Sequence, residues 1–538
     1  MSTYVASYVF ARTDLLAHIT TTLQNDERFV AAWLTGSFGR GEQDVYSDLD
    51  IRVIVADDYS EAFCAQPWPD GARTTDERLA LFSLFGIPSV IYDAHGNAPE
   101  GGTFTYVLYE NGLNVDWILV PQSKAQRASD TLLLFDTVGV SMEPAYTIEP
   151  EEIRAKAASE QVNFFWTMTP IAVKYMLREQ PVAFHDFLEL LHNVLREAER
   201  LVAGEPEHYH GGAYATLCTT LEERVNAIRQ LCERMLALMP QVAHMGGYVA
   251  PSPMSIMTIW LAMADNSALQ ARYAANREAV LARIVETLQA DERIVATWLS
   301  GSYSRHEQDR LSDLDLRIVV ADEYANALCE VPWETASPTT IPERLEFIRQ
   351  FGEPGIIFDT KSMWPEGGSF TLALYYETGL HLDWVLLPQA NAQRPAESMV
   401  LFDMVNVPLE PAPEPESLEQ RITTASDMTG FFWMIAASSL LCLYPPRYDP
   451  VQFHLLLDWL HNALHDVQHA VDGTAKPYHS GAYAQLAPTR REQIAAYRDL
   501  CNRMLALMPE VERMGGYVPL SPMQPVALRL RMLEETEM

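Results

Sequence analysis

The chain has 538 residues, enough for about three or four domains of ordinary size. Hydrophobic residues make up 48% of it and charged residues 20%, which is the composition of a soluble globular protein. The 72 acidic residues outnumber the 38 basic ones and give a formal net charge of −34, so the composition argues against a long nucleic acid as a partner.

The cysteines and the apolar stretches indicate the compartment. The six cysteines are scattered without zinc-finger or Cys-x-x-Cys spacing, which favours reduced thiols in a cytoplasm over a disulfide framework. The first residues contain no basic segment followed by an apolar core, so we expect no signal peptide. The longest apolar stretch, residues 256–264, is about half of what a membrane span needs, so we expect no membrane association.

A long internal repeat dominates the sequence. One motif begins at Trp33 and reads WLTGSFGRGEQDVYSDLDIRVIVAD, and its counterpart begins at Trp298 and reads WLSGSYSRHEQDRLSDLDLRIVVAD, with 16 of the 25 positions identical. Further matches continue along the chain at an offset that drifts only from 265 to 269 residues. A period of this length indicates two tandem copies of a domain rather than a solenoid.

The elements of the first copy can be taken in chain order. Apolar residues at helical spacing between residues 15 and 23 predict an amphipathic helix. Five apolar or β-branched runs then predict strands, at residues 29–35, 48–56, 89–93, 104–109 and 113–120. From residue 151 to residue 239 the apolar spacing is helical, with turns marked by Pro181, Gly204 and Gly211.

The sequence therefore predicts an α/β (α+β) fold built from two tandem copies of a mixed-sheet module, each followed by an α-helical bundle. We place the first sheet module at 1–142, the first helical domain at 143–254, the second sheet module at 269–410 and the second helical domain at 411–524. An acidic, proline-rich stretch at 410–416 marks the boundary inside the second copy. Fused copies of this kind can pair as a pseudo-dimer within one chain, as separate subunits would.

Three aspartates in each copy are the candidate catalytic and metal-binding residues. Asp48 and Asp50 are two residues apart in a predicted strand, so both carboxylates face the same way. Asp116 interrupts an apolar strand, where an unpaired acid is costly to bury. If the two strands are neighbours, three carboxylates converge, and a divalent cation such as Mg²⁺ would relieve their repulsion. The second copy repeats all three, as Asp313, Asp315 and Asp383.

A Gly-Ser pair supplies a candidate phosphate pocket. Gly36 and Ser37 end one strand and open a short helix, where backbone N–H groups and a hydroxyl can approach a phosphate. Arg40 follows at a position from which it can pair with spread negative charge. The second copy repeats the pattern with Gly301, Ser302 and Arg305.

The complete pattern of Gly-Ser, ten residues, Asp-x-Asp and a distant strand aspartate resembles the nucleotidyltransferase superfamily of DNA polymerase beta. The stretch GSFGRGEQDVYSDLD and the trailing helical domain are most similar to the aminoglycoside and lincosamide nucleotidyltransferases of antibiotic resistance. The resemblance implies Mg²⁺, a nucleoside triphosphate (normally ATP) as co-substrate, and transfer of the nucleotidyl group (AMP) to a hydroxyl with loss of pyrophosphate. It also implies that the six aspartates hold the metal ions.

The two helical halves differ at one position. Lys174 lies in a helix of the first copy whose lysine, in the similar enzymes, often reaches the nucleotide phosphates, and the second copy has Leu441 there. We therefore expect Lys174 to serve the first copy and the first copy to be the better catalyst. The alternative is that Lys174 is an ordinary solvated helix residue.

The substrate and the general base remain open at this point. We expect an adenylyltransferase acting on a small hydroxylated molecule, and the acidic composition fits a cationic acceptor such as an aminoglycoside. The alternatives are a non-catalytic or regulatory nucleotide-binding protein of antitoxin-like character, or an enzyme that transfers AMP to a protein or an RNA end. The candidate general bases, each repeated in both copies, are Glu110 with Glu377, Asp93 with Asp359, and Glu189 with Asp458.

Overall fold

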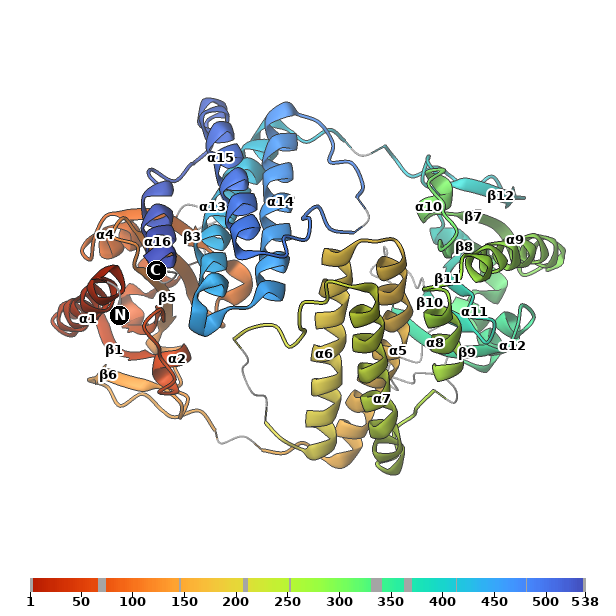
Figure 1. Cartoon of the computed structure of the whole chain (residues 1–538), viewed down its shortest axis with the longest axis horizontal. Helices are drawn as coiled ribbons and strands as arrows, with labels where there is room; N and C mark the ends of the chain where they lie inside the picture. The colour runs from red at the N-terminus through yellow and green to blue at the C-terminus, as the bar shows by residue number, and fades with distance from the viewer. Residues whose placement is uncertain are drawn as a thin grey trace. The chain divides into compact units, whose positions relative to one another are not determined.

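The computed structural model describes residues 3–65, 74–144, 147–206, 211–250, 253–329, 341–361, 370–412, 414–479 and 481–535, except for the side chains of residues 95, 359–361, 370–374 and 446. The chain forms two compact units (Figure 1). Unit 1 consists of Met1–Ala145 together with Pro415–Met538, and unit 2 consists of Tyr146–Glu414. Each unit therefore contains the sheet of one repeat copy and the helical bundle of the other.

Unit 1 combines the N-terminal sheet module with the C-terminal helices. Its strands are β1 (Phe29–Leu34), β2 (Leu49–Val55), β3 (Pro88–Asp93), β4 (Thr103–Tyr109), β5 (Asn114–Pro121) and β6 (Leu132–Asp136). Its helices are α1 (Thr3–Gln24), α2 (Gly36–Gly39), α3 (Ser60–Cys64), α4 (Asp76–Ser83), α13 (Leu418–Ser439), α14 (Pro450–Asp472), α15 (Arg490–Met514) and α16 (Met523–Glu535). Helices α13 and α14 pack side by side, and α13 also packs against β3 (Figure 1).

Unit 2 is one continuous piece of chain in which the helices come first. Its helices are α5 (Glu151–Leu177), α6 (Pro181–Ala203), α7 (Leu221–His244), α8 (Pro253–Ala262), α9 (Ser267–Ala290), α10 (Gly301–Ser304), α11 (Ala325–Cys329) and α12 (Pro342–Arg349). Its strands are β7 (Ile294–Leu299), β8 (Leu314–Val320), β9 (Pro354–Lys361), β10 (Phe370–Tyr376), β11 (His381–Pro388) and β12 (Met399–Asp403). Helices α5 and α6 pack together, and α5 packs against β9 (Figure 1).

The two sheets have the same topology. The strand order is β3-β4-β5-β2-β1-β6 in unit 1 and, read in the same direction, β9-β10-β11-β8-β7-β12 in unit 2. The central pairs β2–β5 and β8–β11 are parallel, and the other pairs are antiparallel. The predicted mixed sheets with helical parts are thus confirmed.

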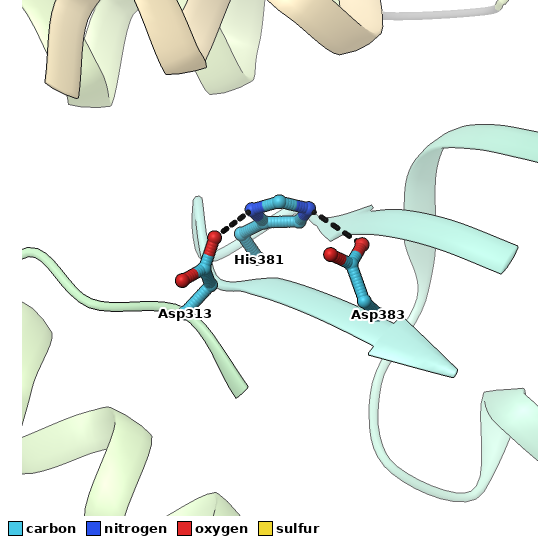
Figure 2. Close-up of side chains that lie close together, drawn as sticks. All are labelled: Asp313, His381 and Asp383. Carbon is cyan, nitrogen blue, oxygen red and sulfur yellow. Dashed lines mark hydrogen bonds and ion pairs between the residues drawn. The ribbon is translucent and has the colours of Figure 1, made fainter. Parts of the chain in front are cut away.

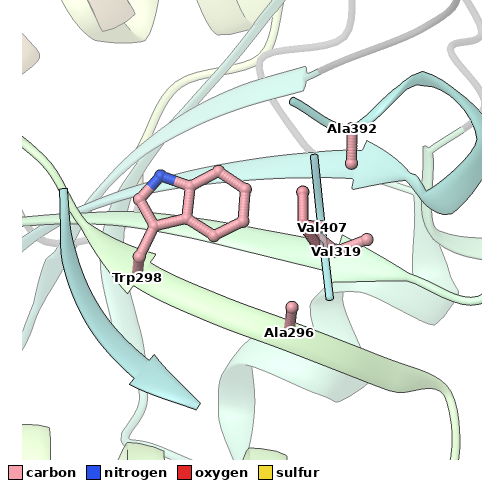
Figure 3. Packing of buried hydrophobic residues seen from close by; sticks show 5 residues of the cluster. All are labelled: Ala296, Trp298, Val319, Ala392 and Val407. Atoms are coloured by element: carbon pink, nitrogen blue, oxygen red, sulfur yellow. The ribbon is translucent and has the colours of Figure 1, made fainter. Parts of the chain in front are cut away.

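A small apolar cluster lies beside the central strands of each sheet. In unit 2 it contains Ala296 and Trp298 of β7 and Val319 of β8, together with Ala392 and Val407 from the segments that flank β12 (Figure 3). Unit 1 has the equivalent cluster of Ala31, Trp33, Ile54 and Val120. Each cluster packs the strand that ends at the Gly-Ser pair (β1 or β7) against the strand that carries the second aspartate of Asp-x-Asp (β2 or β8). This packing fixes the backbone on which the candidate site is built.

Two features differ from the sequence prediction. The edge strands β6 and β12 were not predicted; their first two residues, such as Leu132 and Leu133, are exposed, as is common at the edge of a sheet. Within the described residues, one helical stretch, Leu418–Leu443, is long and apolar enough to cross a membrane, and 61% of its most apolar window is buried. A core helix of a globular protein passes the same test.

Candidate active sites

The sheet register brings three carboxylates together in each unit. Strands β2 and β5 run parallel and pair Asp50 with Asp116, and Asp48 directly precedes β2. Strands β8 and β11 pair Asp315 with Asp383 in the same way, and Asp313 directly precedes β8. Residues paired in register on neighbouring strands lie on the same face of the sheet. The third aspartate of each copy therefore lies beside its Asp-x-Asp pair.

A tight turn places the Gly-Ser pair against these strands. The Ser300 backbone N–H donates to the Asp315 carbonyl at 2.9 Å, and Thr35 does the same to Asp50 at 2.9 Å. Gly301 has a φ of +63°, and a Cβ at this residue would collide with the Asp315 carboxylate. Only glycine combines this left-handed conformation with so close an approach to a side chain.

The serine hydroxyl and the arginine guanidinium of the motif differ in whether they already have a polar partner. Ser302 Oγ is buried and has no hydrogen-bond partner among the described residues. Arg40 and Arg305 each form an ion pair at 2.8 Å with a glutamate two residues further on, Glu42 and Glu307. Arg305 also lines an open pocket formed by residues 304–307 and 396–399, which contains none of the aspartates. The serine is thus better placed than the arginine to bind an anion at the aspartate centre.

The aspartates of unit 1 repel one another, and among the described residues none of the three forms an ion pair with a lysine, arginine or histidine. Burial and the neighbouring Asp48 raise the pKa of Asp50 to about 7, and burial followed by Asp48 and Asp50 raises the pKa of Asp116 well above its usual value. Asp116 Oδ1 is buried and has no hydrogen-bond partner among the described residues. Asn114 Nδ2 donates to Asp48 Oδ2 at 3.1 Å. A divalent cation would relieve this repulsion. Among the described residues, however, the group whose ligand atoms all lie within 4.8 Å of one another is in unit 2 and consists of Asp313, His381 and Asp383.

Unit 2 compensates the same charges with a lysine and a histidine. Lys174 Nζ lies 2.8 Å from Asp313 Oδ2. His381 lies between the two outer carboxylates, with Nδ1 3.1 Å from Asp313 Oδ2 and Nε2 3.0 Å from Asp383 Oδ1 (Figure 2). Burial alone would raise the pKa of Asp313, but Lys174 and His381 outweigh it and hold that pKa well below its usual value. Burial, with Asp313 and Asp383, raises the pKa of Asp315 to about 7.

The placement of Lys174 corrects the sequence prediction. Lys174 lies on α5 in unit 2 and contacts an aspartate of the second copy, so its assignment to the first copy is wrong. Leu441, the counterpart of Lys174, lies in unit 1 just after α13. Lys174 belongs to the first copy in the sequence but lies at the aspartate site of the second copy. The reason is that each unit combines the sheet of one copy with the helices of the other.

One arginine in each unit connects the helical part to the loop before the Asp-x-Asp strand. Arg178, which caps α5, binds both carboxylate oxygens of Asp309 at 2.8 and 2.9 Å. Arg447 binds both carboxylate oxygens of Asp44 at 2.6 Å in unit 1. Both aspartates lie in the loop that leads into the Asp-x-Asp strand. Bidentate pairs of this kind fix orientation as well as charge, so they position the helical bundle over the candidate site.

Most of the candidate general bases have structural partners. Asp93 pairs with the buried Arg78 at 3.0 Å. Glu189 and Asp458 each accept a hydrogen bond at 2.8 Å from the backbone N–H of a following loop, at Ala215 and Ala484. Glu110 accepts one from Ser521 Oγ at 2.9 Å, Glu377 is exposed, and the side chain of Asp359 lies outside the described residues. These contacts do not support a general base among Asp93, Glu189 and Asp458.

Sequence reasoning missed His381, Asn114 and Arg529. His381 lies two residues before Asp383 on β11, and this spacing, which puts both side chains on one face, was a usable signal. Asn114 occupies the equivalent position before Asp116. Arg529 of α16 binds Asn114 Oδ1 at 2.5 Å and the Gly112 carbonyl at 3.2 Å, and no local pattern connects it with residues more than 400 positions earlier.

Comparison with known proteins finds a similarity among solved structures. No family model matches the chain, and no curated protein matches it. Among solved structures, the chain is similar to an aminoglycoside 6-adenyltransferase from Bacillus subtilis, with 13% sequence identity and a TM-score of 0.16. The match covers 48% of this chain and 96% of that one. A TM-score this low carries no information on the activity or the substrate of this chain.

Proposed function

We propose that the chain is a divalent-metal-dependent nucleotidyltransferase whose catalytic centre is the aspartate cluster of unit 2. One observation carries the proposal: Lys174 Nζ lies 2.8 Å from Asp313, in the same unit as the register-paired Asp315 and Asp383. Carboxylates that bind a metal and a cation that binds phosphate are two recurring parts of sites for phosphoryl transfer. Unit 2 has both in one centre.

The three carboxylates of unit 2 would hold Mg²⁺. Burial, with Asp313 and Asp383, raises the pKa of Asp315 to about 7. A bound cation would offset the repulsion between these carboxylates and favour the ionised form of Asp315, which is a metal ligand. Bound Mg²⁺ would polarise the transferred phosphoryl group and stabilise the attacking and leaving oxygens.

The chain's own residues would bind and orient the nucleotide. Lys174 is a buried point charge, and it would exchange its contact with Asp313 for a contact with the triphosphate. The unpartnered Ser302 hydroxyl would donate to a phosphate oxygen, and the left-handed Gly301 leaves space for that oxygen to approach. ATP is the proposed donor, with AMP transferred and pyrophosphate released.

The proposed acceptor is a hydroxyl of a small and cationic molecule of the aminoglycoside type. Its support is the formal net charge of −34, which raises the local concentration of a polycation and repels a polyanion. The proposed location is cytoplasmic, in keeping with six free cysteines, five of them buried.

A second function is proposed for unit 1: binding of metal or nucleotide without turnover. It has Leu441 where unit 2 has Lys174. In addition, β4 places Tyr106 opposite Asp116, whereas β10 places Ala373 opposite Asp383. A centre with three carboxylates but without the lysine can hold a cation yet lacks the charge that would orient a triphosphate.

The test is metal-dependent release of pyrophosphate from ATP with separate acceptor panels: aminoglycosides and lincosamides, proteins, and RNA ends. We expect release with the small cationic acceptors, and its loss in Asp315→Asn. Release of pyrophosphate only with protein or RNA would show that the acceptor is a macromolecule rather than a small cationic molecule. Nucleotide binding without release in any panel would leave the non-catalytic, regulatory function and contradict the proposed activity.

A further inference from the structure

We propose that Asp313, His381 and Asp383 form a divalent-metal site with a nitrogen donor, which takes borderline transition-metal ions such as Mn²⁺, Co²⁺ or Zn²⁺ in preference to Mg²⁺. The inference rests on the proposed function in that it uses two of the same carboxylates. It goes further in assigning the metal class and in adding His381 as a ligand, and it separates the chemistry of unit 2 from that of unit 1.

The geometry of the three side chains fits one ion. Each residue offers a ligand atom, and these atoms all lie within 4.8 Å of one another. The imidazole nitrogens lie 3.0 and 3.1 Å from the two carboxylate oxygens (Figure 2). Two donors at right angles on an ion with bonds of about 2.1 Å lie about 3 Å apart, so an ion can replace the proton between one imidazole nitrogen and its carboxylate partner with little movement. The two nitrogens face different carboxylates, so the second carboxylate would turn toward that ion to become its third ligand.

The histidine is held in a fixed orientation before any ion binds. His381 is only 4% exposed, and its ring stacks on that of Tyr375 with centroids 4.3 Å apart and an interplanar angle of 13°. Tyr375 is the residue paired with His381 across β10 and β11, and its own hydroxyl donates to the Thr167 carbonyl at 2.9 Å. Second-layer contacts of this kind preserve the direction of a ligating imidazole.

Unit 1 provides an internal contrast with the same backbone. Asn114 replaces His381, and Leu108 replaces Tyr375 in the corresponding cross-strand pair. The Asn114 amide donates to Asp48 and accepts from Arg529. Within the part of the chain that the structure describes, no histidine joins Asp48, Asp50 and Asp116 in a group of ligand atoms. Oxygen-only centres suit Mg²⁺, whereas an imidazole donor shifts affinity toward the later transition metals. The two centres should therefore differ in metal preference.

The experiment measures metal binding rather than turnover, with Co²⁺ and Mg²⁺ as probes. The full chain carries Asp50→Asn and Asp116→Asn, so that unit 1 is silenced and binding reports on unit 2. Co²⁺ affinity comes from calorimetry and the visible absorption of the bound ion, and Mn²⁺ spin-echo spectra detect a directly bound imidazole nitrogen. His381→Asn is the test variant, since asparagine already occupies this position in unit 1. His192→Asn, which removes a histidine on α6 of the same unit, is the control.

We expect one Co²⁺ with a nitrogen signal in the parent and in His192→Asn. In His381→Asn the signal disappears and Co²⁺ affinity falls at least about tenfold, since even loss of an outer-layer partner costs roughly 10- to 100-fold. Mg²⁺ affinity should change much less. Thermal melting without metal checks that His381→Asn folds, and if it does not, the nitrogen signal of the parent alone decides. Unchanged Co²⁺ affinity in a folded His381→Asn, or no nitrogen signal in the parent, would overturn the inference.

The result is separable from that of the proposed function. Mg²⁺-dependent release of pyrophosphate without imidazole coordination of Mn²⁺ would leave the transferase and remove this site. Imidazole-coordinated Mn²⁺ without release from any acceptor panel would leave the metal site and remove the transferase.

Discussion

Lys174 Nζ lies 2.8 Å from Asp313 Oδ2, although the two residues belong to different copies of the repeat and are 139 positions apart. Lys174 is buried and Asp313 is partly buried, and removing one member of such a pair destabilises the folded protein because it leaves the other charge uncompensated. The same exchange between copies appears in Arg178 with Asp309 and in Arg447 with Asp44. Each candidate centre is thus assembled from the sheet of one copy and a helix of the other.

Replacing the lysine should inactivate unit 2. Lys174→Leu reproduces the residue found in unit 1, and we expect kcat/KM for pyrophosphate release to fall about 100-fold, the usual cost of losing one preorganised charge. The matched control is Lys156→Leu, an exposed lysine on the same helix, which should keep full activity. Equal activity of the two variants would contradict a role for Lys174 in transfer.

The two aspartate clusters should contribute unequally to turnover. Asp315→Asn removes a proposed metal ligand from the centre that has the lysine, and we expect a loss of at least about 1,000-fold, equivalent to several kcal/mol of metal-assisted stabilisation. Asp50→Asn makes the same change in unit 1 and should leave most of the turnover. Steady-state assays of both variants check this, and equal losses would show that the two centres share catalysis.

A contiguous fragment should contain a complete centre. Residues 146–414 include α5 with Lys174, the whole second sheet and all three of its aspartates. We expect this fragment to fold cooperatively and to bind Co²⁺ as the full chain does. The fragment 1–254 follows the repeat instead and separates each sheet from the helices that pack on it, so we expect it to unfold at a lower temperature. Circular dichroism melting of the two fragments decides, and a stable 1–254 with an unfolded 146–414 would refute the exchanged arrangement.

The raised carboxylate pKa values predict a pH-dependent effect of metal. Burial and charge repulsion raise the pKa values of Asp50 and Asp315 from 3.8 to about 7 in the folded protein. Their contribution to stability is therefore fully present below pH 3.8 and is lost as the pH rises through about 7, because the folded state then carries uncompensated buried charge. We expect Mg²⁺ to raise the melting temperature more at about pH 8 than at about pH 5.5, and Asp50→Asn with Asp315→Asn to abolish the difference.

The glycine of the Gly-Ser turn should tolerate no side chain. Gly301→Ala places a Cβ in a left-handed conformation and against the Asp315 carboxylate, so we expect more destabilisation than the roughly 1–2 kcal/mol of the conformation alone. Gly139→Ala is the control, since Gly139 has a similar φ of +71° but no atom within 4 Å of the added Cβ. Urea unfolding of both variants measures the loss in free energy of unfolding. Equal losses would show that the Asp315 carboxylate moves aside without a cost in free energy.

The sequence by itself determined the parts of the site. The repeat and the alternation of apolar runs predicted two mixed sheets with helical bundles, because strand and helix periodicities are local properties of the chain. The spacing of Asp48, Asp50 and Asp116 predicted carboxylates on one face, and the parallel register of β2 and β5 brings them there. The glycine at residue 36 was likewise readable, because only glycine suits that turn.

Only the tertiary structure decided which parts share a site. Nothing local in the sequence distinguishes a helix that packs on its own sheet from one that packs on the sheet of the other copy, since both present equivalent apolar faces. Lys174 was therefore assigned to the wrong copy, and Arg529, which reaches Asn114 across more than 400 residues, was not foreseen. Pairings between distant segments depend on the packing of the whole chain, and they determine which aspartates acquire a lysine and a histidine and which do not.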